Sequence, residues 1–303
     1  TYNLKMEKNF VIVDANALLH RSFHALPPLA TKKGEPTGAV YGFLLTLFKA
    51  IKDLKPDYIA ACFDFPGPTF RHREFKEYKA QRPKTPEDLA GQIAKTKEVL
   101  KSFNISVFEE EGFEADDLIA TVTAKIQTEG KGLKSYILSG DLDLLQLIDE
   151  NTKIYTLGRG IKETVVYDRE AVLKRFGIEP EQMVDFKALC GDPSDNISGV
   201  LGVGKKTASD LLKKFGNLEK LYQKIEQEQT DIKPRIKEIL LKNKEQAFFF
   251  RNLVMVNKKA PIEFDIEKCR FGGFSKKEGL KTLEKLEFYT LVNRLESLYN
   301  ENA

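Results

Sequence analysis

The sequence predicts an α/β fold, in which a mostly parallel central sheet flanked by helices is followed by a helical region. As far as about residue 168, short runs of β-branched and aromatic residues alternate with longer segments whose apolar residues recur at helical spacing. This alternation is typical of parallel strands joined by helices. Beyond that point helical spacing dominates to the end of the chain. We therefore expect two domains, residues 1–175 and residues 176–303.

The predicted elements follow one another in a regular order. The first part contains strand 10–14, helix 16–25, a loop at 26–38, helix 40–54 and strand 58–64. Thr85 and Pro86 are expected to begin the next helix, 85–103. The remaining elements are strand 105–108, helix 114–128, strand 136–140, a short helix to 148, strands 153–157 and 163–167, and, near the end, an amphipathic helix at 280–298.

The composition is typical of a soluble globular protein. Of 303 residues, 42% are hydrophobic and 31% are charged. No run of 18 apolar residues occurs, and the start lacks the layout of a secretory signal. The three cysteines are widely spaced, as in reduced cytosolic proteins. We expect a cytoplasmic protein that does not bind membranes.

Acidic residues follow three of the predicted strands and begin one helix. Ligands of parallel sheets bind at the carboxyl ends of the strands, so these side chains should meet at one edge. For the helix alone, a simpler interpretation is that acids in a first turn are favoured by the helix dipole. The residues are Asp14, Asp64, Asp141 and Asp143 after strands, and Glu114, Asp116 and Asp117 at the helix start.

Such a convergence of carboxylates requires compensation. Two like charges about 4 Å apart repel by roughly 4 kcal/mol at an effective dielectric constant near 20. The acids must therefore take up protons or share cations. Because the available ligands are oxygens, the cations that fit are Mg²⁺ first and Mn²⁺ second. The sequence thus predicts a metal site.

The segment 71–82 is unusual because, as a helix, it would align Arg71, Phe75, Tyr78 and Arg82 on one face, with Lys79 beside them. Nucleic-acid bases stack on such aromatic rings while the cations hold phosphates. The alternative is a solvated surface helix whose aromatic rings touch the body. With helix 85–103, the segment is expected to form an arch, about residues 70–103, above the acids.

A glycine-rich stretch, 199–208, nearly matches the phosphate-loop pattern of nucleotide hydrolases. Lys206 stands where that pattern needs a hydroxyl and no strand precedes it, so we reject a nucleotide hydrolase. We interpret residues 181–216 as a helix–hairpin–helix in which Lys205, Lys206 and the N–H groups of the second helix hold a DNA phosphate. A simple helical packing unit is the alternative.

Overall charge predicts no partner, since 48 basic and 45 acidic residues leave a net charge of +3. The distribution is informative. Basic residues cluster at 71–84, 205–214 and 233–244, away from the acidic motifs. An enzyme acting on nucleic acid needs this separation, with cations holding phosphates and acids holding metal ions.

Seven motifs in this order resemble the bacterial 5′-nuclease family, which comprises the amino-terminal 5′→3′ exonuclease domain of DNA polymerase I and free-standing relatives, kin to flap endonucleases. The resemblance covers nearly the whole chain. The matching stretches are residues 13–16, 21–25, 39–43, 70–82, 114–117, 139–144 and 191–208.

The resemblance implies a PIN-like nuclease core, a helical arch and a helix-three-turn-helix form of the hairpin. It implies that Asp14, Asp64, Glu114, Asp116 and Asp117 serve one divalent ion, and that Asp141, Asp143, Asp192 and Asp195 serve a second. It implies that Arg21, Arg71, Lys79 and Arg82 steer the scissile phosphate and the 5′ strand. Gly202 and Gly204 would contact duplex DNA, with K⁺ bound at the hairpin.

The expected function is that of a Mg²⁺-dependent, structure-specific 5′ nuclease, a monomer acting on flaps, nicks and 5′ ends of DNA, including RNA-primed ends, in replication and repair near the bacterial nucleoid. A C-terminal polymerase domain in a longer natural protein is left open. Two rivals remain: a DNA-binding module that has lost catalysis, and a toxin-like ribonuclease with a related acidic sheet.

Overall fold

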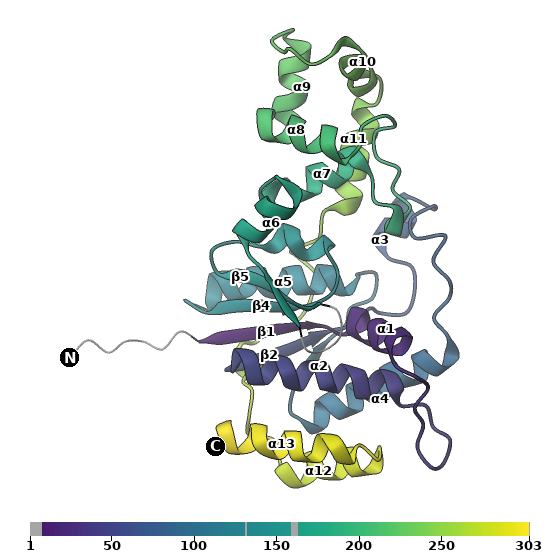
Figure 1. The fold of residues 1–303 in the computed structure, drawn as a ribbon, viewed down its shortest axis with the longest axis vertical. Helices are drawn as coiled ribbons and strands as arrows, with labels where there is room; N and C mark the ends of the chain where they lie inside the picture. The colour runs from purple at the N-terminus through teal and green to yellow at the C-terminus, as the bar shows by residue number, and fades with distance from the viewer. Residues whose placement is uncertain (1–7, 131, 159–162, 303) are drawn as a thin grey trace, which may run out of the picture.

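A computed structural model describes residues 8–302 apart from 131 and 159–162 (Figure 1). Its centre is a six-stranded sheet with the order β3-β2-β1-β4-β5-β6. All neighbouring pairs are parallel except β5 and β6. The strands are β1 (Asn9–Asp14), β2 (Tyr58–Cys62), β3 (Ser106–Phe108), β4 (Lys134–Leu138), β5 (Thr152–Leu157) and β6 (Thr164–Tyr167). The predicted α/β fold is confirmed.

Helices cover both faces of the sheet and build the second half of the chain. The first half contains α1 (Ala15–Ala25), α2 (Gly38–Leu54), α3 (Phe70–Glu74), α4 (Glu87–Ser102), α5 (Ala115–Glu129) and the 3-10 helix η1 (Asp143–Leu147). The second half contains α6 (Arg169–Phe176), η2 (Pro180–Gln182), α7 (Met183–Cys190), η3 (Pro193–Asp195), α8 (Lys205–Phe215), α9 (Leu218–Glu226), α10 (Pro234–Lys242), α11 (Lys244–Val254), η4 (Glu267–Cys269), α12 (Lys276–Lys285) and α13 (Tyr289–Asn302).

The central strand β1 is buried on both faces, and its side chains alternate between two cores. Phe10 and Ile12 pack with the apolar face of α5 and with the helical half of the chain. Val11 and Val13 pack with α1, α2 and α4 on the opposite face. Because strand side chains alternate and both faces are covered, the run reads as continuously apolar in the sequence. The order of strands reverses beside β1, which is where ligands of such sheets bind.

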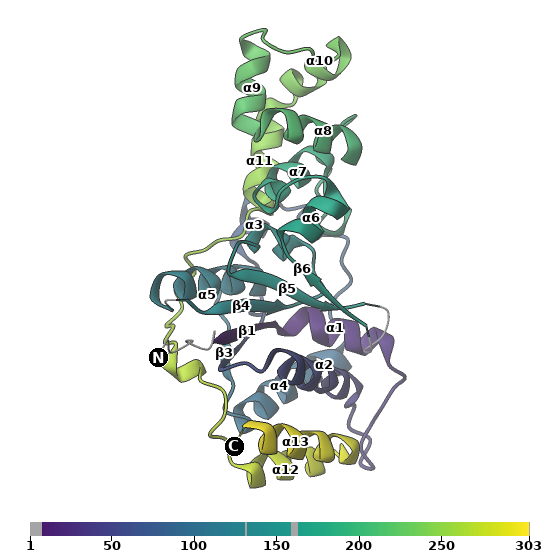
Figure 2. The ribbon, with the colours of Figure 1, turned by 60° about the vertical axis from the view of Figure 1, so that its left-hand side comes forward.

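The helical half divides into two parts at opposite ends of the molecule. Helices α7 to α11 extend away from the sheet along the long axis (Figures 1 and 2). Helices α12 and α13 return to pack on α4 and α2 through residues such as Leu283 and Leu291. Residues 176–303, predicted as one DNA-binding region, therefore divide between the two ends of the molecule. The single helix predicted at 280–298 is wrong, because the chain turns at Glu287, where φ is +59°.

The predicted helix across residues 71–82 is wrong. Helix α3 ends at Glu74, and the following turns, residues 75–82, are called the strap here. The strap leaves helical geometry because it binds the distant turn after α7. The Lys79 amide donates to the Asp195 carbonyl at 3.1 Å, and the Asn196 side chain donates to the Glu77 carbonyl at 2.7 Å. These tertiary bonds replace helical ones, and Lys79 adopts a φ of +54°.

Within the described residues, the helices are all too short or too polar to cross a lipid bilayer.

Candidate metal and nucleic-acid site

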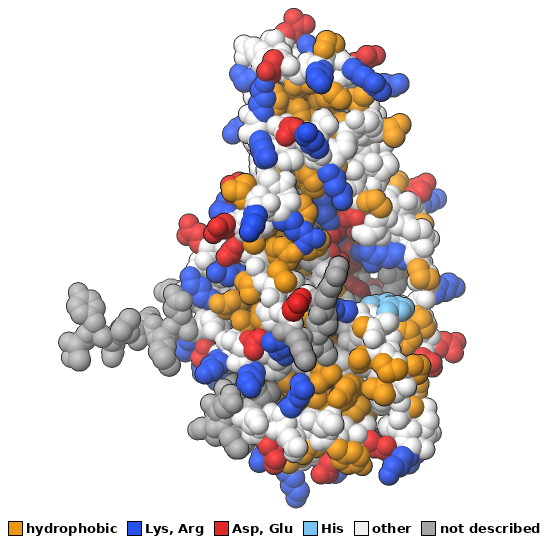
Figure 3. Space-filling model, viewed as in Figure 1, with side chains coloured by type: hydrophobic (Ala, Val, Ile, Leu, Met, Phe, Trp, Pro, Cys, Tyr) orange, Lys and Arg blue, Asp and Glu red, His pale blue; other side chains and the backbone are white. Residues whose placement is uncertain are grey.

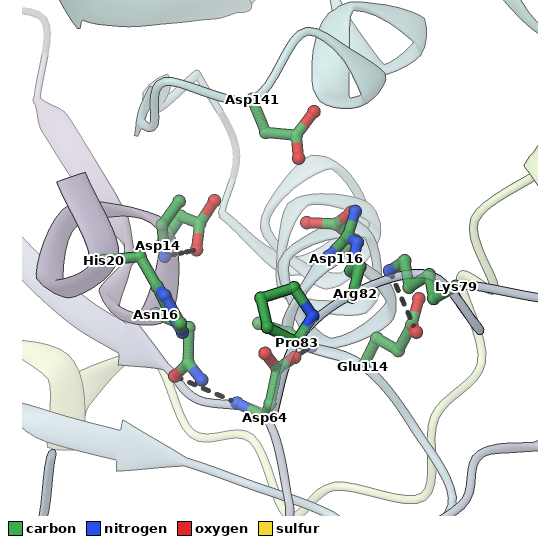
Figure 4. Close-up of a pocket in the computed structure, with 12 residues that line it drawn as sticks. Asp14, Asn16, His20, Asp64, Lys79, Arg82, Pro83, Glu114, Asp116 and Asp141 are labelled. Atoms are coloured by element: carbon green, nitrogen blue, oxygen red, sulfur yellow. Dashed lines mark hydrogen bonds and ion pairs between the residues drawn. The ribbon is translucent and has the colours of Figure 1, made fainter. Parts of the chain in front are cut away.

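Four acidic side chains point into one hollow at the carboxyl edge of the sheet (Figure 4). Asp14 ends β1 and its side chain accepts a hydrogen bond from the first turn of α1. Asp64 follows β2, Asp141 follows β4, and Asp116 lies in the first turn of α5. We call these four residues the first acidic site. The hollow is also lined by Asn16, Ala17, His20, Lys79, Arg82, Pro83, Glu114 and Ala115.

The first acidic site holds negative charges that crowd one another. Burial, with added repulsion from Asp141 and Asp64, raises the pKa of Asp14 to about 7, although the Ser139 hydroxyl opposes the rise. Burial and repulsion from Asp141 and Asp14 raise the pKa of Asp116 well above its ordinary value. Carboxylate oxygens are the ligands preferred by Mg²⁺ and Mn²⁺. The residues present therefore fit a hard divalent cation.

A second acidic site is formed by Asp143, Asp192 and Asp195. One carboxylate oxygen from each lies within 4.8 Å of the others. Two cations occupy its edges: Lys187 Nζ contacts Asp143 and lies 2.7 Å from Asp192 Oδ2, and Arg82 Nη2 lies 2.5 Å from Asp195 Oδ1. The acids come from η1 and from the turn after α7. This donor set also fits a hard divalent cation.

At the second acidic site the pKa of Asp143 is raised and that of Asp192 is lowered, although Lys187 contacts both residues. Burial and repulsion from Asp141 raise the pKa of Asp143 to about 8 even with Lys187 nearby. Burial also acts to raise the pKa of Asp192, but Lys187 and the Ser194 side chain outweigh it and hold that pKa below its ordinary value. Lys187 was missed in the sequence. The signal was a basic residue in a largely apolar helix, five residues before Asp192.

Asp117, expected among the metal ligands, lies elsewhere. Its side chain is fully buried, and both oxygens accept from Arg71 at 2.8 Å. The oxygens also accept from the backbone N–H groups of Glu114 and Asn257. The third position of α5 faces the core, whereas the second, Asp116, faces the hollow. Both oxygens of Asp117 are thus occupied by Arg71 and backbone donors, so this residue can support the turn that carries Asp116 but does not itself face the hollow.

The expected stripe of cations and aromatic rings is wrong. Arg71 is 2% exposed and Tyr78 is 3% exposed. The Tyr78 hydroxyl lies 3.0 Å from both Glu114 Oε2 and Asp195 Oδ2. Phe75 packs edge-on against two phenylalanines of α11. These groups build the interior between strap and body, so base stacking on Phe75 or Tyr78 and a phosphate contact by Arg71 do not fit the structure.

Lys79 and Arg82 are the two strap cations that line the hollow. Lys79 Nζ lies 3.0 Å from Glu114 Oε1. Burial acts to raise the pKa of Glu114, but Lys79 and Arg71 outweigh it and lower that pKa. Arg21, on α1, donates to the carbonyls of Leu157 and Gly158 at 2.9 and 2.6 Å. Figure 3 shows acidic side chains at the bottom of the hollow, with basic side chains near its edge.

The predicted hairpin joins α7 to α8 through backbone contacts. A Cβ atom on Gly199 would lie 2.3 Å from the Gly191 nitrogen, so only glycine fits there. The tip carries Leu201, which is 84% exposed. The two predicted helices are confirmed, and α8 begins at Lys205 as expected. The exposed residues at the end of the hairpin and the start of α8 are Gly202, Gly204, Lys205 and Lys206.

Two family models match the chain in succession. Residues 9–177 match the model described as "5'-3' exonuclease, N-terminal resolvase-like domain". Residues 178–277 match the model described as "5'-3' exonuclease, C-terminal SAM fold". The second match ends where α12 begins, close to the point at which the chain returns to the core.

Named relatives are similar over nearly the whole chain. DNA polymerase I of Bacillus subtilis is 41% identical over 288 residues, which are 95% of this chain and 32% of that protein. The 5'-3' exonuclease of Aquifex aeolicus is 38% identical over 294 residues, 97% of each chain. The chain thus spans about a third of the length of the DNA polymerase I relatives.

Solved structures share the fold at lower identity. A T5 5'-exonuclease with bound zinc ions has a TM-score of 0.65 at 20% identity, covering 98% of this chain and all of that one. The catalytic core of Rad2 in complex with a DNA substrate has a TM-score of 0.61 at 19% identity, covering 97% and 93%.

Proposed function

The chain belongs to the 5′-3′ exonuclease family, and on that premise we propose that it is a divalent-metal-dependent 5′ nuclease of DNA. Its proposed substrates are 5′ flaps, nicks and 5′ ends of duplexes, including RNA-primed ends. The observation that supports the proposal best is the pair of acidic sites side by side at one sheet edge. Negative charges gathered in this way are useful to a protein that binds cations and costly to one that does not.

Each acidic site has its own place in the proposed reaction. Asp14, Asp64 and Asp116 would hold one ion together with Asp141, which the resemblance assigns to the second ion. Glu114, which the resemblance assigns to the first ion, would support this site through Lys79, and the second acidic site would hold another ion. We propose Mg²⁺ as the natural ion and Mn²⁺ as a substitute, because both prefer oxygen ligands. Such ions, when bound, polarise a phosphoryl oxygen and lower the pKa of a bound water.

Lys79 and Arg82, the strap cations that line the hollow, are proposed to bind the phosphate of the substrate. Lys79 and Arg82 now neutralise Glu114 and Asp195 at the border between the two acidic sites. With a phosphate in the hollow, both side chains would exchange a carboxylate partner for phosphate oxygens and stabilise the charge that develops there. Arg21 stays at the end of β5, where it fixes the side of the hollow next to α1.

The hairpin is proposed to hold the duplex. Lys205 and Lys206 begin α8, whose first N–H groups are free to bind a phosphate. Gly202 and Gly204 leave the hairpin backbone exposed, and K⁺ at this position is part of the proposal. Contacts of this type position DNA without reading its sequence. We propose a monomer that works in the cytoplasm at the nucleoid, with a polymerase domain among its partners because the polymerase relatives are about three times longer.

The rival interpretation is a DNA-binding module without catalysis. The raised pKa values of Asp14, Asp116 and Asp143 argue against it, because a pure binding module gains nothing from keeping buried acids crowded together. A ribonuclease of the toxin type is disfavoured by the presence of the hairpin half, which we propose to bind duplex DNA.

The test is cleavage of a labelled 5′-flap duplex. We expect cleavage with Mg²⁺, none with EDTA, and a rate lower by on the order of 10³-fold for Asp116→Ala, since a lost metal ligand removes several kcal/mol of stabilisation. Asp168→Ala, at the start of α6, is the matched control and should cleave normally. Cleavage that survives EDTA, or its absence with Mg²⁺, would overturn the proposal, and faster cleavage of single-stranded RNA would favour the ribonuclease.

A further inference from the structure

Arg71 is a buried arginine whose guanidinium donors are all used. Nε donates to the Leu253 carbonyl at 2.8 Å. Nη1 donates to Asp117 Oδ2 at 2.8 Å and to Glu114 Oε2 at 3.3 Å. Nη2 donates to Asp117 Oδ1 at 2.8 Å and to the Met255 carbonyl at 3.0 Å. These bonds account for the five N–H groups of an arginine. The side chain therefore has no donor left for a ligand.

The partners of Arg71 come from two places far apart in the sequence. Leu253 lies at the end of α11, and Met255 caps that helix. Glu114 and Asp117 are the N-cap and third residue of α5. The Asn257 amide makes a second link between these two places, because it donates to Asp117 Oδ1 at 2.7 Å. The first turn of α5 is thus fixed to the segment that leaves α11.

The same turn of α5 supplies the first acidic site. Asp116 and Asp117 are consecutive, and a helix turns by about 100° per residue, so one faces the hollow and the other faces Arg71. Asp116 has no freedom to shift unless Asp117 shifts with it. A change at Arg71 must then reach the metal ligands, although Arg71 itself lies outside the hollow.

Helix α11, which supplies the Leu253 carbonyl to Arg71, connects in turn to the hairpin. Helix α11 packs along α7, and α7 ends at Gly191, where the hairpin and the second acidic site begin. Arg71 therefore lies between the part of the chain proposed to hold duplex DNA and the part proposed to hold a metal ion.

We propose that Arg71 is a positioning residue that couples the position of α11 and the hairpin to the position of Asp116 in the first acidic site. The proposal rests on the proposed function, since it requires that Asp116 hold a divalent ion. It predicts that duplex DNA at the hairpin and a metal ion at the first acidic site raise each other's affinity, and that this mutual effect needs Arg71. Partners that orient metal ligands typically change metal affinity by about 10- to 100-fold when removed.

The experiment measures Mn²⁺ binding by electron paramagnetic resonance, with and without a nicked duplex. The variants are Arg71→Lys, which keeps the charge but loses the two-pronged contact, and Asp117→Asn, which keeps the shape and covers the case in which the first variant does not fold. Arg169→Met is the control. It removes another arginine of the helical half, whose Nη1 lies 2.8 Å from Glu179 Oε2, outside α5, α7 and α11.

We expect Arg71→Lys and Asp117→Asn to bind Mn²⁺ about tenfold more weakly at the first acidic site. We also expect both to lose the increase in affinity that DNA produces in the unmodified protein. Arg169→Met should keep both quantities within about twofold. Unchanged Mn²⁺ affinity and an unchanged effect of DNA in the two variants would overturn the inference. If the unmodified protein bound no Mn²⁺, the proposed function would fail instead.

Discussion

Each acidic site must compensate the repulsion between its own carboxylates, and the two sites do so in different ways. At the first, Asp14 and Asp116 are crowded by other acids, and their pKa values rise. At the second, Lys187 and Arg82 are placed against the carboxylates, and the pKa of Asp192 falls despite its burial. Proton uptake compensates the charge at the first site, whereas the second combines internal cations with proton uptake by Asp143.

The comparison teaches how a site can be kept ready for metal ions before they arrive. A protonated carboxyl group releases its proton to the solvent when a cation binds, so filling the first acidic site is linked to pH. At the second acidic site Asp143 also gives up a proton and Lys187 must move aside, so filling it is linked both to pH and to a side-chain movement. Four predictions test this difference, in order of expected effect.

Lys187→Met should cause the largest change. The lysine side chain is 13% exposed and contacts two acids, and removal of one partner from a buried ionic group costs about 3 kcal/mol or more. We expect this loss in urea unfolding at pH 8 with EDTA, and recovery of most of it with Mn²⁺. Lys214→Met removes an exposed ion pair with Asp231 and should cost far less stability, because solvent screens exposed pairs. Equal losses in the two variants would remove the proposed role of Lys187.

Asp14→Asn should act in the opposite direction. A carboxyl group whose pKa is raised in the folded state contributes stability below its unfolded pKa, and that stability is lost as pH rises through about 7. Asparagine does not ionise, so the variant should be more stable by about 2 kcal/mol at pH 8 in EDTA, after allowance for the Ser139 hydrogen bond. The gain should vanish near pH 4. Asp168→Asn, at another helix start, should show no gain.

Proton release on metal binding should occur at both acidic sites. Between pH 5 and 8, Mn²⁺ affinity should rise by up to about tenfold per pH unit for each displaced proton, because Asp14 and Asp143 lose protons with pKa values of about 7 and 8. Calorimetry in two buffers of different ionisation enthalpy measures the protons directly. Asp14→Asn should reduce their number at pH 6. Binding without proton release would contradict the assigned pKa values.

Lys205→Ala should have the smallest effect. A lysine that contacts one phosphate releases about one counterion, so the slope of log affinity against log salt should fall by about one unit for a nicked duplex. Metal binding should be unaffected. The exposed Lys268, on η4, offers a control in which the slope stays the same. An unchanged slope for Lys205→Ala would place the DNA elsewhere.

The sequence predicted those features that depend on local pattern. The strands, the helices around them and the convergence of Asp14, Asp116 and Asp141 follow from residue periodicity and from the geometry of parallel sheets. The start of α8 at Lys205 followed from its glycine turn. These signals lie within about 20 residues of the element that they define.

The remaining features depend on contacts between distant residues. Arg71 was taken for a surface cation, yet its partners Asp117 and Leu253 lie 46 and 182 positions away. The strap was expected to be helical, but its backbone bonds a turn 116 positions further along the chain, from Lys79 to Asp195. Helical spacing in the sequence does not reveal such partners, because a buried arginine and an exposed one have the same local neighbours.

Two glycines that pack backbone against backbone shape the hairpin, and they restrict which residues its sequence can accept. Where Gly199 meets Gly191, no atom larger than hydrogen can be added. Leu201, between them and α8, touches so little that its identity is free to change. A saturation library of this loop should show two positions with a single tolerated residue next to one that accepts almost anything, so new DNA-facing chemistry can evolve there without disturbing the turn.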